Sequence, residues 1–208
     1  MLEYNDMKIK RFIGGNLESN GYIISEENRC YIIDPGYNPG RFIKEVREKD
    51  LEPLGIILTH HHYDHSGAAD AVASELECPV LLHRRDGDIY RGRVDRFLED
   101  GDVLELGTGA ASRRLEIINT PGHTHGSICI MDEKDRLCFT GDTVFNVDLG
   151  RTDLEDGSES EMRDSICNIV DSWPNDIMLY PGHGDPANMK KVRRINREFT
   201  EMTETKVK

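Results

Sequence analysis

Short apolar runs alternate with polar turns along most of this chain, a pattern typical of β-strands. Three such runs open the sequence at 7–13, 22–25 and 30–33, separated by Gly, Asn and Glu-rich turns. Later runs lie at 55–58, 79–82, 101–107, 115–119, 127–131, 137–140 and 177–180. The pattern therefore predicts about ten strands, which fall into two groups along the chain.

Helical spacing of apolar residues lies between and after these runs. It predicts helices over 39–49, 71–76 and 159–173, and one basic closing helix over 189–199. The segment 83–100 is polar, arginine-rich and poorly periodic, which indicates a mobile connection with a helical turn. Each group of strands is accompanied by helices, so we expect an α+β fold with two sheets packed face to face and helices outside.

Length and charge narrow the class of protein. We expect residues 1–208 to form a single domain, because no linker interrupts the pattern. The formal net charge of -13 disfavours nucleic acid and anionic membranes as partners. The start of the sequence has no secretory signal and no stretch reaches the length of a membrane span, so we expect a cytoplasmic protein.

The cysteines predict reduced thiols. The sequence has five, and no Cys-x-x-Cys, which argues against a disulfide framework or a structural zinc knot. If the hairpin turn is centred between Glu133 and Lys134, Cys129 and Cys138 face each other on adjacent strands.

A histidine-rich stretch follows the apolar run 55–58 and precedes a predicted helix. Within it, alternation in an extended segment places His60, His62 and Asp64 on one side and His61 on the other. His65 falls at the start of the helix and turns back toward the same side. Four metal-competent residues within six positions indicate a metal site rather than a polar turn.

Three later strand ends add further donors, each beside small turn residues that let the backbone approach a site. These donors are His123, Asp142 and His183. Seven N and O donors exceed one tetrahedral zinc site but suit two metals roughly 3.5–4 Å apart that share a carboxylate. We interpret His61 and His83 as structural, while His125 is open between a structural role and orientation of the substrate.

The motifs resemble the metallo-β-lactamase superfamily along nearly the whole chain. Its H-x-H-x-D-H pattern is met at 60–65, and its T-P-G-H-T-x-G-S pattern at 120–127. Asp34-Pro35-Gly36 is similar to the early strand-end aspartate motif, and 141–145 to its G-D-x-x-F. The resemblance implies an αββα four-layer sandwich with the metal site at the edge of the two sheets.

Carried over by position, the resemblance implies ligands for two divalent metal ions. The first metal would take His60, His62 and His123, and the second Asp64, His65 and His183, with Asp142 shared between both. Asp34 would orient the ligand loop by accepting hydrogen bonds. Zinc is the expected metal, with iron or manganese as alternatives, because His and Asp donors accept all three.

The sequences around Arg151 and His183 resemble single-domain glyoxalase II-like hydrolases. The expected activity is hydrolysis of an anionic small-molecule thioester by a hydroxide held between the metals, with Asp64 and Asp142 as the catalytic carboxylates. Arg151 is the candidate for binding a substrate carboxylate, or it pairs with Asp153 or Glu155. Glyoxalase II carries an added C-terminal helical domain that binds glutathione, whereas one helix is predicted after His183 here, so we do not expect that mode of glutathione recognition.

Two alternatives stay open on the sequence. Arg151-Thr152-Asp153 is also similar to persulfide dioxygenases, which hold one iron, although those enzymes lack the Gly-His-Gly form kept at 182–184. A lactonase or another ester hydrolase of the same superfamily is the second alternative. The sequence does not define the physiological substrate or the oligomeric state.

Overall fold

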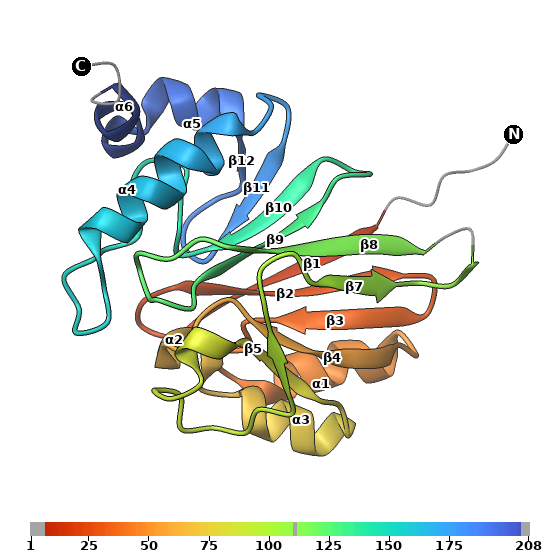
Figure 1. Ribbon diagram of the computed structural model, residues 1–208. Helices are drawn as coiled ribbons and strands as arrows, with labels where there is room; N and C mark the ends of the chain where they lie inside the picture. The colour runs from red at the N-terminus through yellow and green to blue at the C-terminus, as the bar shows by residue number, and fades with distance from the viewer. Residues whose placement is uncertain (1–6, 110–111, 205–208) are drawn as a thin grey trace, which may run out of the picture.

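The structure is a computed structural model that describes residues 7–109 and 112–204. Within these residues the strands form two six-stranded sheets. The first sheet has the order β1-β2-β3-β4-β5-β6, and the second has the order β12-β11-β10-β9-β8-β7. Figure 1 shows the two sheets facing each other, with helices on the outer side of each.

The first sheet begins as a meander and continues with parallel strands. Its antiparallel part comprises β1 (Lys8–Gly14), β2 (Ser19–Glu26) and β3 (Arg29–Ile33). Its parallel part adds β4 (Glu52–Leu58), β5 (Val80–His83) and β6 (Arg96–Leu98). Parallel neighbours need crossover connections, which are supplied by α1 (Pro39–Glu48), α2 (Tyr63–Ser66) and α3 (Ala69–Leu76).

The second sheet repeats this plan. Its antiparallel part comprises β7 (Val103–Leu106), β8 (Arg113–Asn119), β9 (Ile128–Asp132) and β10 (Leu137–Gly141). The connection through α4 (Glu159–Asn168) and the 3-10 turn η3 (Val170–Ser172) leads to β11 (Met178–Pro181), which is parallel to β10. The chain then passes through β12 (Ala187–Asn188), α5 (Met189–Ile195) and α6 (Arg197–Glu204).

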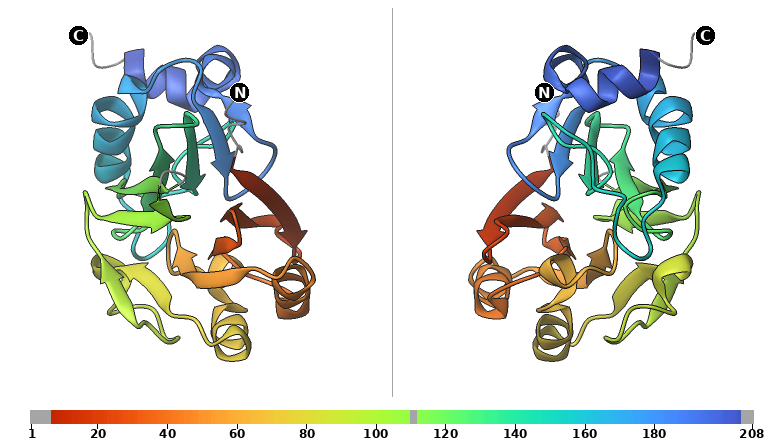
Figure 2. Two further views of the ribbon diagram at one scale, coloured as in Figure 1. Left: turned by 90° about the vertical axis from the view of Figure 1, so that its right-hand side faces the viewer. Right: turned by 90° about the vertical axis from the view of Figure 1, so that its left-hand side faces the viewer.

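Three hydrophobic cores pack the sheets and helices together. Between the sheets lies a core that includes Ile33, Ile57, Ile117 and Phe139. A second core packs the first sheet on α1 and α3, and a third packs the second sheet on α4, α5 and α6. Figure 2 shows the same order of layers from both sides. The expected α+β fold, an αββα four-layer sandwich, is therefore confirmed.

Two strands of the structure differ from the prediction. The segment 83–100 is not only a connection: after a 3-10 turn, η1 (Arg84–Asp86), β6 extends the first sheet. Only one of the three residues of β6 is buried, so this strand shows no apolar alternation in the sequence. The two-residue strand β12 was not predicted, because so short a strand leaves no pattern.

The closing helix is divided at Asn196, so two helices follow His183 rather than one. Asn196 is buried with a non-helical ψ of 105°, and its side chain accepts from the backbone N–H of Phe199 at 2.9 Å. It also donates to the carbonyls of Phe145 and Asp148. The residue therefore ends α5 and caps α6.

The predicted register of the β9–β10 hairpin is wrong by two residues. Cys138 lies opposite Met131, not opposite Cys129. The turn spans 133–136, where Arg136 adopts a φ of 53° and the carboxylate of Asp132 accepts from the backbone N–H of Lys134. Cys129 and Cys138 consequently lie diagonally on one face, and all five cysteines are buried, as predicted.

No helix within residues 7–109 or 112–204 combines the length and hydropathy that crossing a membrane requires.

Candidate metal centre

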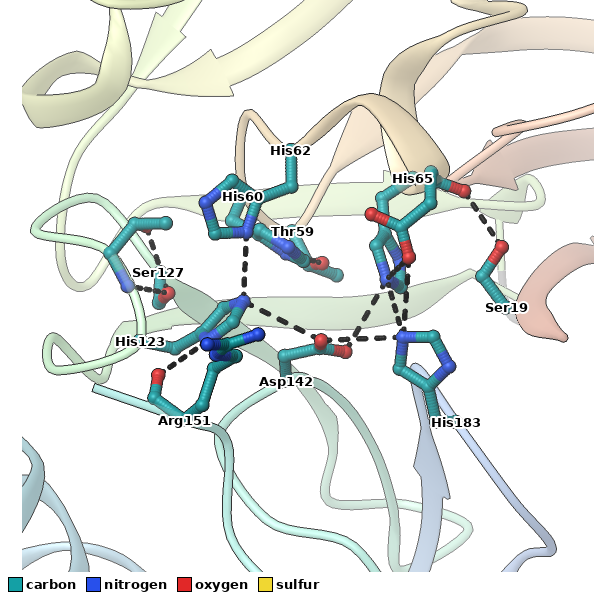
Figure 3. A network of polar contacts seen from close by, with 12 residues as sticks. Ser19, Thr59, His60, His62, His65, His123, Ser127, Asp142, Arg151 and His183 are labelled. Carbon is teal, nitrogen blue, oxygen red and sulfur yellow. Dashed lines mark hydrogen bonds and ion pairs between the residues drawn. The ribbon is translucent and has the colours of Figure 1, made fainter. Parts of the chain in front are cut away.

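The candidate site lies where strands from both sheets end. Asp34 follows β3, His60 follows β4, His123 follows β8, Asp142 follows β10 and His183 follows β11. The backbone N–H of Ile128 donates to the carbonyl of Thr59 at 2.9 Å, which joins the two sheets at this edge. Figure 3 shows the imidazoles and carboxylates of these loops pointing toward one another.

One group of donors is formed by His60, His62 and His123, whose ligand atoms lie within 4.8 Å of one another. We call it the first triad. The Nδ1 of His62 lies 2.9 Å from the Nε2 of His123. The Nδ1–H of His123 donates to the carbonyl of Arg151 at 2.8 Å, so its Nε2 carries the lone pair. The Nε2 of His60 is buried without a hydrogen-bond partner.

A second triad is formed by Asp64, His65 and His183, again within 4.8 Å. The Nε2 atoms of His65 and His183 lie 3.2 Å apart, and each is 3.3 Å from Oδ2 of Asp64. The Nδ1–H of His65 donates to Asp34, and that of His183 donates to the carbonyl of Leu17 at 3.0 Å. The facing Nε2 atoms are therefore the ones that would bind a metal once any proton on them is displaced.

Asp142 lies between the triads. Its Oδ1 is 3.4 Å from the Nε2 of His65, and its Oδ2 is 3.5 Å from the Nε2 of His123 and 3.4 Å from that of His183. Oδ1 is buried and makes no hydrogen bond. Gly182 permits this packing, because a Cβ there would stand 2.1 Å from Oδ1. Asp142 is thus positioned to serve both groups of donors.

This donor set fits divalent metal ions. Pairs of imidazole lone pairs 2.9 and 3.2 Å apart repel each other unless a proton or a cation lies between them. Two of the three buried side-chain atoms without a hydrogen-bond partner among the described residues, on His60 and Asp142, face the same space. Buried polar atoms are rarely left unpaired, so a cation ligated by N and O atoms accounts for both.

The two triads differ in their affinity for protons. Burial and the neighbouring imidazoles hold the pKa of His60 well below its usual range and lower the pKa of His62 to about 4. Burial also opposes protonation of His183, but Asp142 and Asp64 outweigh it and raise the pKa of His183 to about 9. Without metal, these imidazoles of the first triad are neutral, whereas His183 carries a proton at pH 7.

Asp34 holds the ligand loop from behind. One carboxylate oxygen accepts from the backbone N–H of Thr59 at 2.8 Å. The other accepts from the Thr59 hydroxyl at 2.6 Å and from the Nδ1–H of His65 at 3.1 Å. The residue itself adopts a φ of 49°, a conformation that Asp tolerates better than most residues. Its contacts fix both the loop and the tautomer of His65.

The candidate substrate residues lie at the periphery. The Arg151 guanidinium is 61% exposed and makes two contacts of 2.7 and 2.8 Å with Asp153, while only its carbonyl touches the first triad. His125 is 43% exposed and pairs with Glu161 at 2.6 Å. The side chains of both residues therefore contact neighbouring acids.

Two carboxylates near the first triad were missed by the sequence analysis. Asp86 and Asp156 contact the two ring nitrogens of His61, at 3.0 and 3.2 Å. Asp86 lies in the polar segment 83–100, and Asp156 lies in an acidic loop, so neither stands out by spacing. The ring of His61 lies 4.7 Å from the ring of His62, and the two imidazoles form a further group of possible metal ligands with Asp156. Buried His83 accepts from the backbone N–H of Arg85.

Comparison with known proteins agrees with this site. The chain is 31% identical to probable metallo-hydrolase YqgX of Bacillus subtilis, covering 88% of this chain and 93% of that protein. It is 29% identical to hydroxyacylglutathione hydrolase GloC of Haemophilus influenzae, covering 84% and 89%.

Solved structures share the fold. BLEG-1 B3 metallo-beta-lactamase superposes with a TM-score of 0.82 at 29% identity, covering 91% of this chain and 98% of that chain. TTHA1623 in a di-iron-bound form gives 0.80 at 27%, covering 90% and 98%. ETHE1 from Myxococcus xanthus gives 0.81 at 24%, covering 95% and 89%. Residues 14–185 match the metallo-beta-lactamase superfamily, and the chain therefore belongs to that superfamily.

Proposed function

We propose that this chain is a metal-dependent hydrolase that cleaves a small anionic thioester at a site for two divalent metal ions. The observation that carries the proposal is the pair of triads that share Asp142. In the proposed assignment, His60, His62 and His123 hold the first metal, and Asp64, His65 and His183 hold the second. Asp142 is the carboxylate that belongs to both.

When bound, two divalent ions would supply an activated water and polarise the substrate carbonyl. The chain's own groups do the rest. Hydrogen bonds from His183 and His65 outweigh the effect of burial and hold the pKa of Asp64 well below its usual range, so its carboxylate stays ionised. An ionised carboxylate only accepts hydrogen bonds, so Asp64 can accept one from the attacking water and orient it.

The thioester assignment is supported by the resemblance to glyoxalase II-like hydrolases and by the relative named hydroxyacylglutathione hydrolase GloC. Arg151 is the proposed contact for a substrate carboxylate, since a guanidinium binds that group through two hydrogen bonds. In the structure this position is taken by Asp153. A substrate carboxylate must therefore compete with Asp153, which predicts weak selection for negative charge.

A persulfide dioxygenase with one iron is the second candidate, because the fold of ETHE1 from Myxococcus xanthus is similar. That likeness concerns the fold alone. Seven convergent donors favour the two-metal hydrolase, since a single iron held by two His and one Asp would leave His183 and the rest of the second triad without a role.

Elemental analysis of the protein as purified, combined with a thioester hydrolysis assay, distinguishes the two candidates. The proposal expects two metal ions per chain and release of free thiol. One iron per chain, with oxygen consumption on a persulfide, would instead support the dioxygenase. If the protein hydrolysed lactones or oxygen esters but not thioesters, the proposed metal site would stand and the proposed substrate class would be wrong.

A further inference from the structure

His61 lies between two carboxylates directly beside the first triad. Its Nδ1 is 3.0 Å from Oδ2 of Asp86, and its Nε2 is 3.2 Å from Oδ2 of Asp156. Its side chain is 11% exposed, and those of Asp86 and Asp156 are 0% and 11% exposed. Nδ1 of His61 is hydrogen-bonded to Asp86, whereas Oδ2 of Asp156 is buried without a hydrogen-bond partner, so its approach to Nε2 is an ion-pair contact only. The three largely buried side chains form a row beside the first triad.

Asp86, at one end of this row of side chains, contacts both ligand loops. Besides the His61 ring, it accepts from the backbone N–H of His61, the hydroxyl of Thr124 and the backbone N–H of Gly126. A Cβ on Gly126 would stand 2.4 Å from Oδ1 of Asp86, so the contact requires glycine. The loop that carries His62 and the loop that carries His123 are therefore held by one carboxylate.

Asp156 lies at the other end of the row, beside His62 of the first triad. Its Oδ1 is 3.8 Å from the Nε2 of His62, on the opposite side of the ring from the Nδ1 that faces His123. For Nδ1 to offer a lone pair, the proton of neutral His62 must be on Nε2, which faces Asp156. At 3.8 Å the two atoms do not form a hydrogen bond, but the negative charge of the carboxylate favours this tautomer over the one with the proton on Nδ1.

We propose that Asp156 and His61 are positioning residues for the first metal, which hold His62 in the orientation and tautomer that direct Nδ1 into the first triad. Asp156 acts on His62 through its charge, and His61, held by Asp86, lies against Asp156 and limits where that carboxylate can move. The inference rests on the ligand assignment of the proposed function. It concerns metal binding alone, so it can be tested without any hydrolysis.

Zinc titration of the metal-free protein against a chromophoric chelator tests the proposal. The variants are Asp156→Asn and His61→Gln, and the matched control is Asp153→Asn, which changes an exposed carboxylate of the same loop. The binding step that disappears in His183→Ala is assigned to the second triad. We expect the affinity for the first metal to fall about 10–100-fold in both test variants, with the second step and the control unchanged.

Two further readouts separate positioning from folding. The absorption spectrum of Co²⁺ in the first site should change in Asp156→Asn, and the thermal midpoint of the metal-free variant should match that of the parent. Because His61 acts through Asp156, the double variant should lose little more affinity than Asp156→Asn alone.

Three results would overturn the proposal. If Asp156→Asn bound the first metal as tightly as the parent, Asp156 would have no positioning role. An equal loss at both sites with a lower thermal midpoint would make the residues structural. A third equivalent of zinc bound by the parent and lost in Asp156→Asn would make Asp156 a ligand instead of a positioning residue.

Discussion

Replacing Asp34 by Asn should weaken the second metal site selectively. Asn keeps the size and tolerates the φ of 49°, but one carboxylate oxygen becomes an NH₂ group. The oxygen facing the Thr59 backbone must remain an acceptor, because that N–H can only donate. The NH₂ therefore faces the Nδ1 of His65. It would donate to that nitrogen and move the His65 proton to Nε2, the atom proposed to bind metal.

The magnitude follows from the hydrogen bond that metal binding must then break. Restoring the Nε2 lone pair in Asp34→Asn leaves a buried N–H group facing another N–H group, which costs about 1–3 kcal/mol. Each 1.4 kcal/mol is about a factor of ten, so the second-metal affinity should fall roughly 5- to 150-fold. This oxygen reaches the first triad through the Thr59 hydroxyl, which lies 3.1 Å from the Nδ1 of His60, so the affinity for the first metal should change much less.

Competition titration of metal-free protein with zinc and a chromophoric chelator measures both affinities in one experiment. Asp153→Asn is the control, because it also neutralises one carboxylate but lies on the surface. Equal weakening of both steps would mean that Asp34 only stabilises the loop. Unchanged binding of the second metal would refute the tautomer argument.

Other predictions concern the second triad and the loop at Arg151. His183→Ala should leave one metal per chain and reduce hydrolysis by orders of magnitude; one metal fewer at the parent rate, by elemental analysis and assay, would contradict the two-metal mechanism. Since the pKa of His183 is raised to about 9 without metal, binding of the second metal should displace a proton below that pH. Its affinity should then rise about tenfold per pH unit for each proton displaced. With the pKa of His62 near 4, first-metal affinity should vary little between about pH 6 and 8, as titrations in several buffers can show. Arg151→Ala should keep both metals, because His123 contacts only the carbonyl of Arg151, and should raise KM more for carboxylate-bearing thioesters than for neutral ones. Equal KM changes would leave Arg151 as a partner of Asp153.

The fold could be predicted from the sequence because most strands are apolar and end at marked turns. The elements that were missed lack that contrast: β6 has mostly exposed residues and β12 has two residues. The break at Asn196 was hidden because the apolar positions continue across it, and only the buried side-chain contacts to Phe145 and Asp148 reveal the boundary.

The proposed ligands were easier to predict from the sequence than the residues that surround them. The proposed ligands are dense in one loop and otherwise follow strand ends, so spacing and motif reveal them. Asp86 and Asp156 contact His61 from 25 and 95 positions away in the chain. No local pattern marks such residues, since their role depends on how three loops meet. The sequence left open whether Arg151 pairs with a neighbouring acid or binds a substrate carboxylate. The structure shows the pair with Asp153, and the contact with substrate stays a proposal.

The central claim is a hydrolase that depends on two metals. Its most direct test is to titrate metal-free protein with zinc while following release of thiol from an anionic thioester. The account predicts that hydrolysis rises until two equivalents per chain are bound and then stays constant. Full activity at one equivalent, or no thiol release with both equivalents bound, would contradict it.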